Sequence, residues 1–295
     1  MRKSIHITLS HCLLMGGLAI ACVMPAPVRA AKPEPSYDSD QTIAYKQIGE
    51  RSLHLYVFKP SAWSAQDRRP GVVYFHGGGW ILGNPGMAKP TVAALAKEGF
   101  VIVSVQYRFT ARDPAEADPS PCIEDAKSAM RYVRAHAAEL GIDPTRIAAA
   151  GASAGGHLSA ACALLAGFDS PADDRKVSCR PDAMALTVPV LDNGPGGYKG
   201  DVPKIRANVK AYSPAHNVAP DAPPTIMFAG RDDQLAKLAL LEQFQKRMRE
   251  QGNDCELHTY PGPHGFYLQA PASDDIAAKT VEFFRRLGWI AAPRG

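Results

Sequence analysis

Short, almost wholly apolar runs recur along the chain, and each is bounded by glycine or proline. They cover residues 71–75, 100–105, 146–151, 183–190, 225–230 and 256–260. Strands that are apolar along their whole length are typical of sheets buried on both faces, so the runs predict a mainly parallel sheet. The stretches between them are longer. Residues 122–140, 235–252 and 274–290 carry apolar side chains at helical spacing and predict amphipathic helices.

The first two predicted strands differ from the rest because their apolar and polar residues alternate. Residues 42–49 and 52–60 follow this pattern and meet at Gly49-Glu50, which predicts an antiparallel N-terminal hairpin with a tight turn. Repeated strand–helix units come after it. We therefore expect a single α/β domain, with a mainly parallel central sheet and helices on both of its faces.

Two segments could carry a cap over one edge of this sheet. Residues 31–41 are few and rich in proline, which disfavours a pair of helices there. Residues 191–213 begin with glycine-rich sequence and have room for one short helix. We therefore expect no large cap and an open site.

The composition is that of an ordinary globular protein. The chain has 295 residues, of which 46% are hydrophobic and 21% are charged, and this excludes a disordered chain, a collagen and a coiled coil. It carries 33 basic and 29 acidic residues, and three of the basic ones lie within residues 1–30. The remainder is nearly neutral. Because phosphate binding needs a basic face, we expect no nucleic-acid partner.

The first thirty residues have the layout of a secretory signal peptide. Arg2 and Lys3 precede the apolar run 13–23, and Val28-Arg29-Ala30 offers small side chains at a cleavage site. The run has 11 residues where a membrane-spanning helix needs about 20, so stable membrane insertion is not expected. We predict cleavage after Ala30, export to the periplasm or the medium, and a mature domain of residues 31–295.

A lipoprotein is the weaker alternative for this segment. Lipidation of Cys22 would need Leu three residues earlier, where Ala19 stands. After cleavage four cysteines remain, and export makes disulfides chemically allowed. They are Cys122, Cys162, Cys179 and Cys255. A bridge between Cys162 and Cys179, or free buried thiols, both agree with the sequence. None of the four lies in a CxxC motif or near a spaced His pair, so we expect no metal site.

A GxSxG motif follows the apolar run 146–151 directly. Its serine is Ser153, placed between a predicted strand and a predicted helix. A serine on such a sharp turn points its hydroxyl out above the sheet edge, and the turn needs small neighbours, here Gly151 and Gly155. The helix that starts there also directs its N-terminal N–H groups toward any negative charge beside Ser153. Ser153 is therefore the predicted nucleophile.

A second motif, His76-Gly77-Gly78-Gly79-Trp80, follows the run 71–75. A glycine triplet at the end of a strand lets backbone N–H groups face a ligand without hindrance. We expect Gly78, Gly79 and the residue after the nucleophile, Ala154, to donate to an oxyanion. His76 is expected to brace this loop. GxGxxG and GK[ST] are absent, so phosphate binding is not predicted.

A serine nucleophile needs a histidine base and a carboxylate that orients the histidine. His264 lies in the loop after the last predicted strand, where a base is expected, whereas His157 and His258 lie on a helix and inside a strand. The preceding strand, residues 225–230, is followed by two candidate acids. These are Asp232 and Asp233.

Four segments together resemble one branch of a known family. They are HGGGW (76–80), DPTRIAAAGASAGGHL (143–158), YSPAHNVAPDAPPTIMFAGRDDQL (212–235) and YPGPHGF (260–266). The chain is similar to the bifunctional feruloyl and acetylxylan esterases of the α/β-hydrolase fold, close to the hormone-sensitive-lipase-like esterases. The family's GxxD pattern, counted from Gly230, selects Asp233 as the acid. The sequence departs from the family at Gln234, where proline is usual.

These features predict a serine carboxylesterase that works without metal or cofactor. The resemblance implies short-chain acyl esters as substrates, acetyl or feruloyl groups on polysaccharides among them, so the partner is a small-molecule or carbohydrate ester. An amide or peptide hydrolase of the aryl formamidase or aminopeptidase type would use the same residues, and an inactive binding module is the remote alternative. Trp80 and Phe266 flank the motifs and are expected to wall the substrate pocket, with packing in the core as the alternative. The sequence makes no prediction of the oligomeric state.

Overall fold

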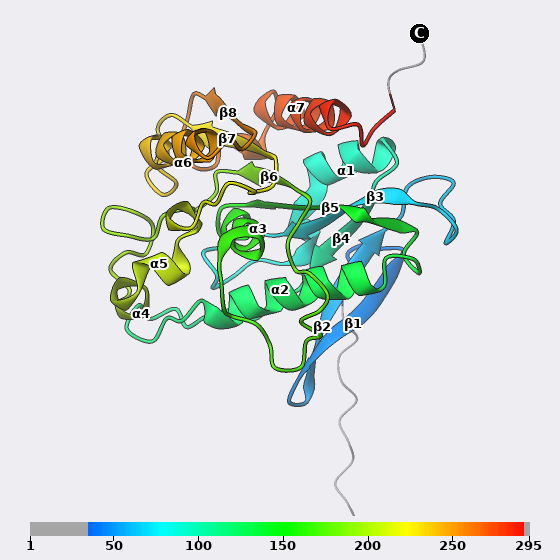
Figure 1. Cartoon of the computed structure of the whole chain (residues 1–295), viewed down its shortest axis with the longest axis horizontal. Coiled ribbons are helices and arrows are strands. Elements are labelled where there is room, and N and C mark those ends of the chain that lie inside the picture. The colour runs from blue at the N-terminus through cyan, green and yellow to red at the C-terminus, as the bar shows by residue number, and fades with distance from the viewer. Residues whose placement is uncertain (1–34, 292–295) are drawn as a thin grey trace, which may run out of the picture. The chain divides into compact units, whose positions relative to one another are not determined.

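The computed structural model describes residues 35–291, and Figure 1 shows their arrangement. The predicted signal peptide, residues 1–30, lies outside the described residues. Eight strands form one sheet in the order β1-β2-β4-β3-β5-β6-β7-β8. Their bounds are β1 Gln41–Ile48, β2 Arg51–Phe58, β3 Arg69–Phe75, β4 Val101–Val105, β5 Ile142–Ala152, β6 Ala183–Thr187, β7 Thr225–Gly230 and β8 Cys255–Tyr260.

Seven α-helices and three short 3₁₀ helices connect or follow these strands in the described part of the chain. The α-helices are α1 Lys89–Lys97, α2 Ser120–Ala135, α3 Ala154–Leu164, α4 Pro203–Ala207, α5 Val209–Tyr212, α6 Leu238–Glu250 and α7 Ala272–Arg286. The 3₁₀ helices are η1 Pro85–Ala88, η2 Pro214–His216 and η3 Phe266–Leu268.

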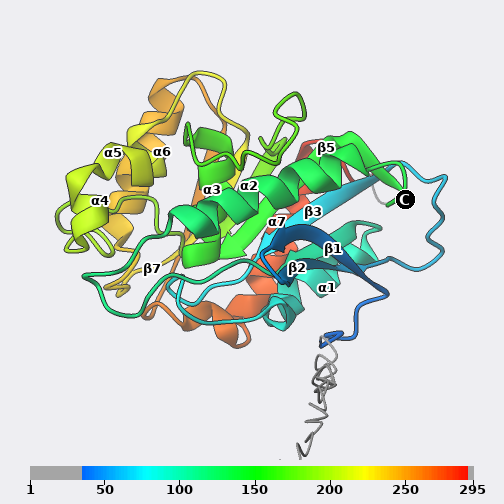
Figure 2. The same cartoon turned by 90° about the horizontal axis from the view of Figure 1, so that it is seen from below.

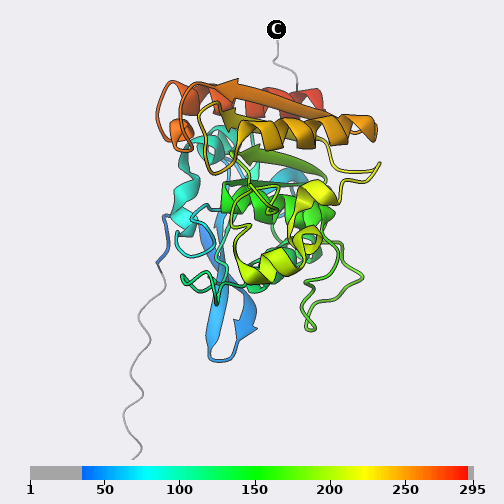
Figure 3. The same cartoon turned by 90° about the vertical axis from the view of Figure 1, so that its left-hand side faces the viewer.

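The pairing of the strands agrees with the alternation in the sequence. The hairpin β1–β2 is antiparallel, and β2 pairs antiparallel with β4. All other neighbours, from β4 through β3, β5, β6 and β7 to β8, are parallel. The predicted α/β fold with an antiparallel N-terminal hairpin is therefore confirmed. Figure 3 shows the hairpin and the β8–α7 region at opposite ends of the sheet.

Helices cover both faces of the sheet, as the apolar strands require. Figures 1 and 2 show α2 and α3 on one face and α1 and α7 on the other. Val73 and Ala149 belong to the core with α2 and α3, whereas Val72 and Ala148, the preceding residues on the same strands, pack toward α1 and α7. A third cluster joins α6 to β6 and β7. The two-residue period of a strand places alternate side chains in opposite cores.

Two predicted segments differ from the structure. Strand β6 ends at Thr187, three residues before the predicted end, because Val188 adopts a positive φ of 41° and Pro189 follows. Residues 191–213 hold two short helices, α4 and α5, where one was expected. Pro203 begins α4, and Asn208 ends it and caps α5 by accepting the N–H of Ala211.

The four cysteines within residues 35–291 are free thiols. The suggested bridge between Cys162 and Cys179 is not formed, although the two residues are neighbours: the Cys179 thiol donates to the Cys162 carbonyl at 3.7 Å. Burial raises the pKa of Cys122 and of Cys255 to about 12, so both are neutral at physiological pH. Across residues 35–291 no helix is long and apolar enough to cross a membrane.

Candidate active site

Ser153 occupies a sharp turn between strand β5 and helix α3. Its φ is 56° and its ψ is −118°, an uncommon conformation for a residue with a side chain. The turn also brings the first residues of α3 very close to the ends of β3 and β5. A Cβ on Gly155 would lie 1.9 Å from the Phe75 carbonyl oxygen, and one on Gly151 would lie 2.5 Å from the Gly155 backbone. The glycines of the motif are therefore required by this geometry.

A continuous chain of hydrogen bonds runs from Ser153 through His264 to Asp233. The His264 Nε2 and the Ser153 Oγ are 2.9 Å apart, and the His264 Nδ1 and the Asp233 Oδ2 are 2.7 Å apart. Ser153 follows β5, Asp233 follows β7 and His264 follows β8. Because parallel strands end at the same edge of a sheet, residues 111 positions apart meet there.

The two neighbouring aspartates have different partners. Asp233 is buried, and its second oxygen accepts the backbone N–H groups of Leu235 and Ala236 at 2.8 and 2.9 Å. Asp232 is exposed and accepts the N–H of Gly262 at 3.1 Å. The structure thus brings Asp233 to the histidine, whereas Asp232 braces the loop that carries it.

The glycine loop after β3 lies beside Ser153. A Cβ on Gly77 would be 3.5 Å from the Ser153 Cβ. Gly78 has a φ of 125°, and a Cβ there would lie 2.0 Å from the Leu82 carbonyl oxygen, so only glycine fits. Among the hydrogen bonds of residues 35–291, none uses the N–H of Gly78, Gly79 or Ala154. The three predicted oxyanion donors are therefore without an acceptor in the part of the chain that the structure describes.

His76 is buried at the base of this loop. Its Nδ1 lies 2.7 Å from the Gly77 carbonyl oxygen, and its ring stacks on Tyr107 at 4.3 Å between centroids. The Tyr107 hydroxyl also donates to the His76 carbonyl oxygen at 2.8 Å. Burial lowers the pKa of His76 to about 4, opposed by the bond to Gly77. The neutral ring supports the loop as a bracing group.

Neither Trp80 nor Phe266 lines the cavity beside the site. Trp80 is 1% exposed and packs in the core, edge-on to His157 at 4.9 Å between ring centroids. Phe266 stacks on Tyr260 at 5.0 Å. For Trp80 the structure therefore favours the alternative, packing in the core, whereas Phe266 is half-buried and its place at the pocket stays a prediction. Trp80 directly follows the glycine loop with a positive φ of 63°, and this turns its side chain inward.

The sequence pattern did not single out Tyr198, which lies over the glycine loop. A Cβ on Gly79 would be 2.7 Å from the Tyr198 hydroxyl, and the Tyr198 ring lies 5.5 Å from that of Trp80. Burial raises the pKa of Tyr198, so the phenol is neutral at physiological pH. Tyr198 belongs to the glycine-rich segment between β6 and α4. An aromatic residue within such a segment was the only signal available in the sequence.

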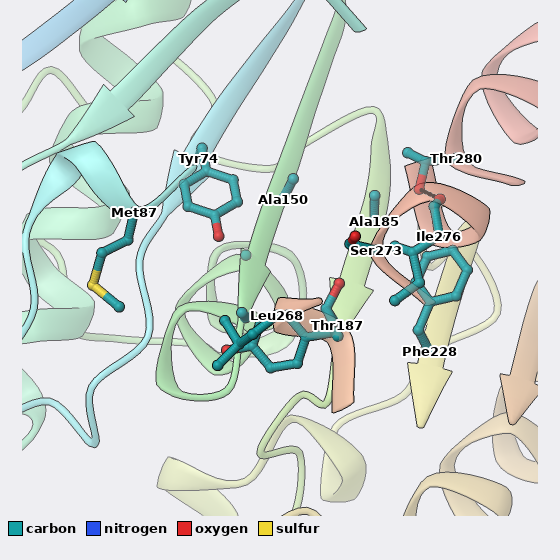
Figure 4. Close-up of a pocket in the computed structure, with 13 residues that line it drawn as sticks. Tyr74, Met87, Ala150, Ala185, Thr187, Phe228, Leu268, Ser273, Ile276 and Thr280 are labelled. Carbon is teal, nitrogen blue, oxygen red and sulfur yellow. Dashed lines mark hydrogen bonds between the residues drawn. The ribbon is translucent and has the colours of Figure 1, made fainter. Parts of the chain in front are cut away.

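A cavity of about 90 Å³ opens next to the turn that carries Ser153 (Figure 4). Its walls come from the last residues of β3, β5, β6 and β7 and from η3 and α7. It therefore lies on the α1–α7 face of the sheet. No group of three or more metal-ligating side chains capable of holding an ion occurs within residues 35–291.

Comparisons with known proteins agree with this geometry. Residues 55–188 match the BD-FAE family. The chain is 32% identical over 249 residues to the probable carboxylic ester hydrolase LipM of Mycobacterium tuberculosis, and the match covers 77% of this chain and 55% of LipM. It is 28% identical to an acetylxylan esterase of Xylanibacter ruminicola, covering 66% of this chain and 40% of that protein. The chain thus spans about half the length of these curated relatives.

A solved esterase matches over nearly its whole length. The apo form of Thermogutta terrifontis esterase 2 superposes with a TM-score of 0.80 at 34% identity, and the match covers 88% of this chain and 98% of that one. The same esterase has also been solved with bound propionate, with a TM-score of 0.81. The chain therefore belongs to the carboxylic ester hydrolases of the α/β-hydrolase fold.

Proposed function

We propose that the protein is a serine carboxylesterase whose catalytic residues are Ser153, His264 and Asp233. The observation that carries the proposal is the chain of two hydrogen bonds, 2.9 and 2.7 Å long, that joins the serine, histidine and aspartate. A serine hydroxyl is a weak nucleophile, and an adjacent base activates it. The similarity to carboxylic ester hydrolases supports the reaction class.

The proposed reaction has two halves. The Ser153 Oγ attacks the ester carbonyl carbon while the His264 Nε2 accepts the hydroxyl proton, and the same nitrogen then gives the proton to the leaving alcohol. The His264 Nδ1–H donates to Asp233, which holds the tautomer and stabilises the imidazolium that forms. Water then attacks the acyl-enzyme by the same route and releases the acid. No metal or cofactor takes part in this proposal.

The negative charge on the carbonyl oxygen is assigned to the backbone N–H groups of Gly78, Gly79 and Ala154. These donors have no acceptor in the described part of the chain, and they belong to a turn and a loop whose glycines cannot be replaced without a clash. Donors that are already oriented stabilise the transition state at little reorganisation cost. Helix α3 begins at Ala154, so its positive end faces the same oxygen.

Short acyl groups on small molecules or carbohydrates are the proposed substrates. A match to an acetylxylan esterase supports acetyl groups on polysaccharides, and the Thermogutta esterase has been solved with propionate and with butyrate. Between β6 and β7 the described chain has the short helices α4 and α5 and the 3₁₀ helix η2, none longer than five residues, which supports an open site for the alcohol part of the ester.

A paired assay tests the reaction class. We expect rapid hydrolysis of 4-nitrophenyl acetate and no detectable hydrolysis of 4-nitroacetanilide, and we expect acetate release from acetylated xylan. Ser153→Ala is the matched control because it removes only the nucleophile. Hydrolysis of 4-nitroacetanilide as fast as that of 4-nitrophenyl acetate would indicate an amidase and contradict the proposed esterase. Release of ferulate from methyl ferulate at the rate of acetate release would extend the substrate to aromatic acids.

We also propose export, on the basis of the charged and apolar pattern of residues 1–30. The mature protein is then expected to begin at Ala31. Intact-mass measurement of the protein from the periplasm or the medium tests this site. A protein that retains residues 1–30 in the membrane fraction would contradict cleavage.

A further inference from the structure

Three buried polar atoms near the glycine loop have no hydrogen-bond partner within residues 35–291. They are the Trp80 Nε1, the His157 Nδ1 and the Asn193 Oδ1. Trp80 is 1% exposed, and His157 and Asn193 are not exposed at all. Leaving a buried donor or acceptor unpaired costs free energy, and most such groups in folded proteins are paired with protein atoms or with ordered water. Three of them together therefore need a physical explanation.

The three side chains are neighbours, although they come from separate parts of the chain. The His157 Nε2 lies 2.9 Å from the Tyr212 carbonyl oxygen, and the Asn193 Nδ2 lies 2.8 Å from the same oxygen. The Trp80 ring stands edge-on to the His157 ring, with 4.9 Å between the centroids. His157 thus contacts Trp80 and shares its carbonyl partner with Asn193. The three unpaired atoms therefore belong to one small region of the interior.

The hydrogen-bonding role of each unpaired atom follows from its chemistry. The Trp80 Nε1–H can only donate, and the Asn193 Oδ1 can only accept. The Tyr212 carbonyl oxygen also only accepts, so the His157 nitrogen that faces it, Nε2, carries a proton. Burial lowers the pKa of His157 to about 4, opposed by the bond to Tyr212, so the ring is neutral at physiological pH and its Nδ1 is an acceptor. The region therefore holds one unpaired donor and two unpaired acceptors.

One water molecule satisfies this set of groups. Its oxygen accepts the hydrogen of the Trp80 Nε1, and its two hydrogens go to the His157 Nδ1 and the Asn193 Oδ1. Buried waters in proteins typically make about three hydrogen bonds to groups that would otherwise be unpaired. A cation would leave the Trp80 donor without a partner, and an anion would face two acceptors. The chemistry therefore favours a neutral molecule that both donates and accepts.

The same three residues connect segments that surround the nucleophile. Trp80 directly follows Gly79, one of the assigned oxyanion donors. His157 lies in α3, and its backbone N–H donates to the Ser153 carbonyl oxygen at 3.0 Å. Asn193 lies in the segment between β6 and α4 that covers the glycine loop. A bridge between these side chains therefore links the glycine loop to the nucleophile helix.

We propose that one buried water molecule is hydrogen-bonded to the Trp80 Nε1, the His157 Nδ1 and the Asn193 Oδ1, and that it holds the glycine loop in position. The water site goes beyond the esterase function proposed above, and only its effect on the rate rests on that function. Oxyanion donors stabilise charge that develops in the transition state, so a displaced glycine loop lowers kcat more than it raises KM. The three side chains are positioning residues.

The nuclear Overhauser effect between water and the indole N–H groups tests the site directly, in protein with ¹⁵N-labelled tryptophan. The chain has three tryptophans, so Trp63→Phe and Trp289→Phe assign two indole signals and leave that of Trp80. We expect a cross-peak between the Trp80 indole N–H and a long-lived water. Trp63 is the matched control and should lack this cross-peak, because its Nε1 donates to the Leu140 carbonyl oxygen at 3.0 Å. A crystal structure should place one water oxygen about 2.7–3.2 Å from all three atoms.

Kinetics test the positioning role. Trp80→Phe keeps an aromatic ring and removes the indole donor, and we expect kcat on 4-nitrophenyl acetate to fall about ten-fold with KM changed less than about two-fold. Trp63→Phe also removes an indole donor, but its partner Leu140 lies just before β5 begins, whereas Ser153 follows the end of that strand. Both constants of Trp63→Phe should match the wild type. Circular dichroism on the same samples reports whether each variant is folded.

The possible outcomes separate the water site, its positioning role and the esterase function. A Trp80 indole without the cross-peak, or a direct hydrogen bond between two of the three atoms in a crystal structure, would overturn the water site. Wild-type kcat in folded Trp80→Phe, or an equal loss in Trp63→Phe, would overturn the positioning role. A wild type without any ester hydrolysis would instead overturn the esterase function, and the cross-peak would still decide the water site.

Discussion

Two regions of the molecule gather polar groups: the carboxyl edge, where the parallel strands of the sheet end, and an ion cluster beside α2. The polar groups of the cluster bind one another, whereas several at the carboxyl edge have no partner in the described part of the chain. We define the α2 ion cluster as Lys127, Arg131, Asp169 and Asp173. Lys127 donates to two carbonyl oxygens at 2.6 Å, and Arg131 pairs with Asp169 at 2.5 Å and Asp173 at 3.0 Å. At the carboxyl edge, by contrast, the N–H groups of Gly78 and Gly79 have no acceptor among residues 35–291.

This difference suggests that the ion cluster contributes to the stability of the fold and the carboxyl edge to the reaction. The charged groups of the cluster are largely buried, so each needs a partner of opposite charge in the folded state. Their hydrogen-bond donors are therefore all engaged within the protein. Donors at the carboxyl edge are oriented by glycine geometry and remain open to a bound substrate. We therefore expect substitutions at the edge to change rates with little change in stability, and substitutions in the cluster to do the reverse.

The largest expected effect is on the rate at the carboxyl edge. Ser153→Ala and His264→Ala should each lower kcat by about 10⁵-fold, because only binding and the oxyanion donors then remain. The melting temperature should stay within 2 to 3 °C of the wild type, by roughly the scaling of small free-energy changes. Steady-state kinetics and circular dichroism on the same samples measure both. A folded Ser153→Ala protein with wild-type turnover would contradict the nucleophile assignment.

The two adjacent aspartates sharpen the comparison within the edge itself. Asp233→Asn should lower kcat by about 10³- to 10⁴-fold, because an amide cannot hold the required histidine tautomer. Asp232→Asn keeps an acceptor for the Gly262 N–H and should lower kcat less than ten-fold. The two variants differ by one position and have the same side-chain change, so each is the control for the other. A larger loss in Asp232→Asn would reverse the assignment of the acid.

Substitutions in the ion cluster should lower the stability of the protein and leave its catalytic rate unchanged. Arg131→Leu leaves the buried carboxylates of Asp169 and Asp173 without this partner, and we expect a loss of about 3 to 5 kcal/mol in the free energy of unfolding. Arg175 also pairs with Asp169, at 3.3 Å, but its side chain is 73% exposed. Arg175→Leu is the matched control and should cost less than about 0.5 kcal/mol. Urea unfolding measures both, and a drop in kcat/KM of folded Arg131→Leu beyond two-fold would break the separation.

Acid pH should lower the free energy of unfolding through His157, a buried histidine that packs against Trp80 after the glycine loop. Burial lowers the pKa of His157 to about 4, while a hydrogen bond to the Tyr212 carbonyl acts in the opposite direction. A free histidine titrates near 6.5, so between pH 6.5 and 4 the unfolded chain binds the extra proton. Stability is complete above this range and declines as the pH falls, by up to about 1.4 kcal/mol per pH unit for each such histidine.

The effect of pH is the smallest of the four predicted effects. It is measured as the slope of the melting temperature against pH. We expect the melting temperature of the wild type to fall from pH 6.5 to pH 4, and that of His157→Gln to fall less steeply over the same interval. The comparison uses the change with pH within each protein, so a constant loss from the substitution cancels. Equal slopes would show that His157 is protonated, or titrates normally, in the folded protein.

Much of the fold could be read from local patterns. The hairpin and the buried strands were predicted because strand periodicity and turn residues act over a few neighbours. The end of β6 was misplaced because Val188 looks like a strand residue, and only its positive φ ends the strand. The inward turn of Trp80 has the same origin, since a backbone angle set by the neighbouring loop decides which way the ring points.

The sequence alone determined the α/β architecture and the positions at which a nucleophile, a base and an acid were expected, because parallel strands end at one edge and the motifs mark those ends. Tertiary structure decided what depends on contacts between distant segments. It laid Tyr198 over Gly79 and enclosed the cavity between β5, β6 and α7. Space and hydrogen-bond partners arise only when segments far apart in the chain pack together, so no local pattern encodes them.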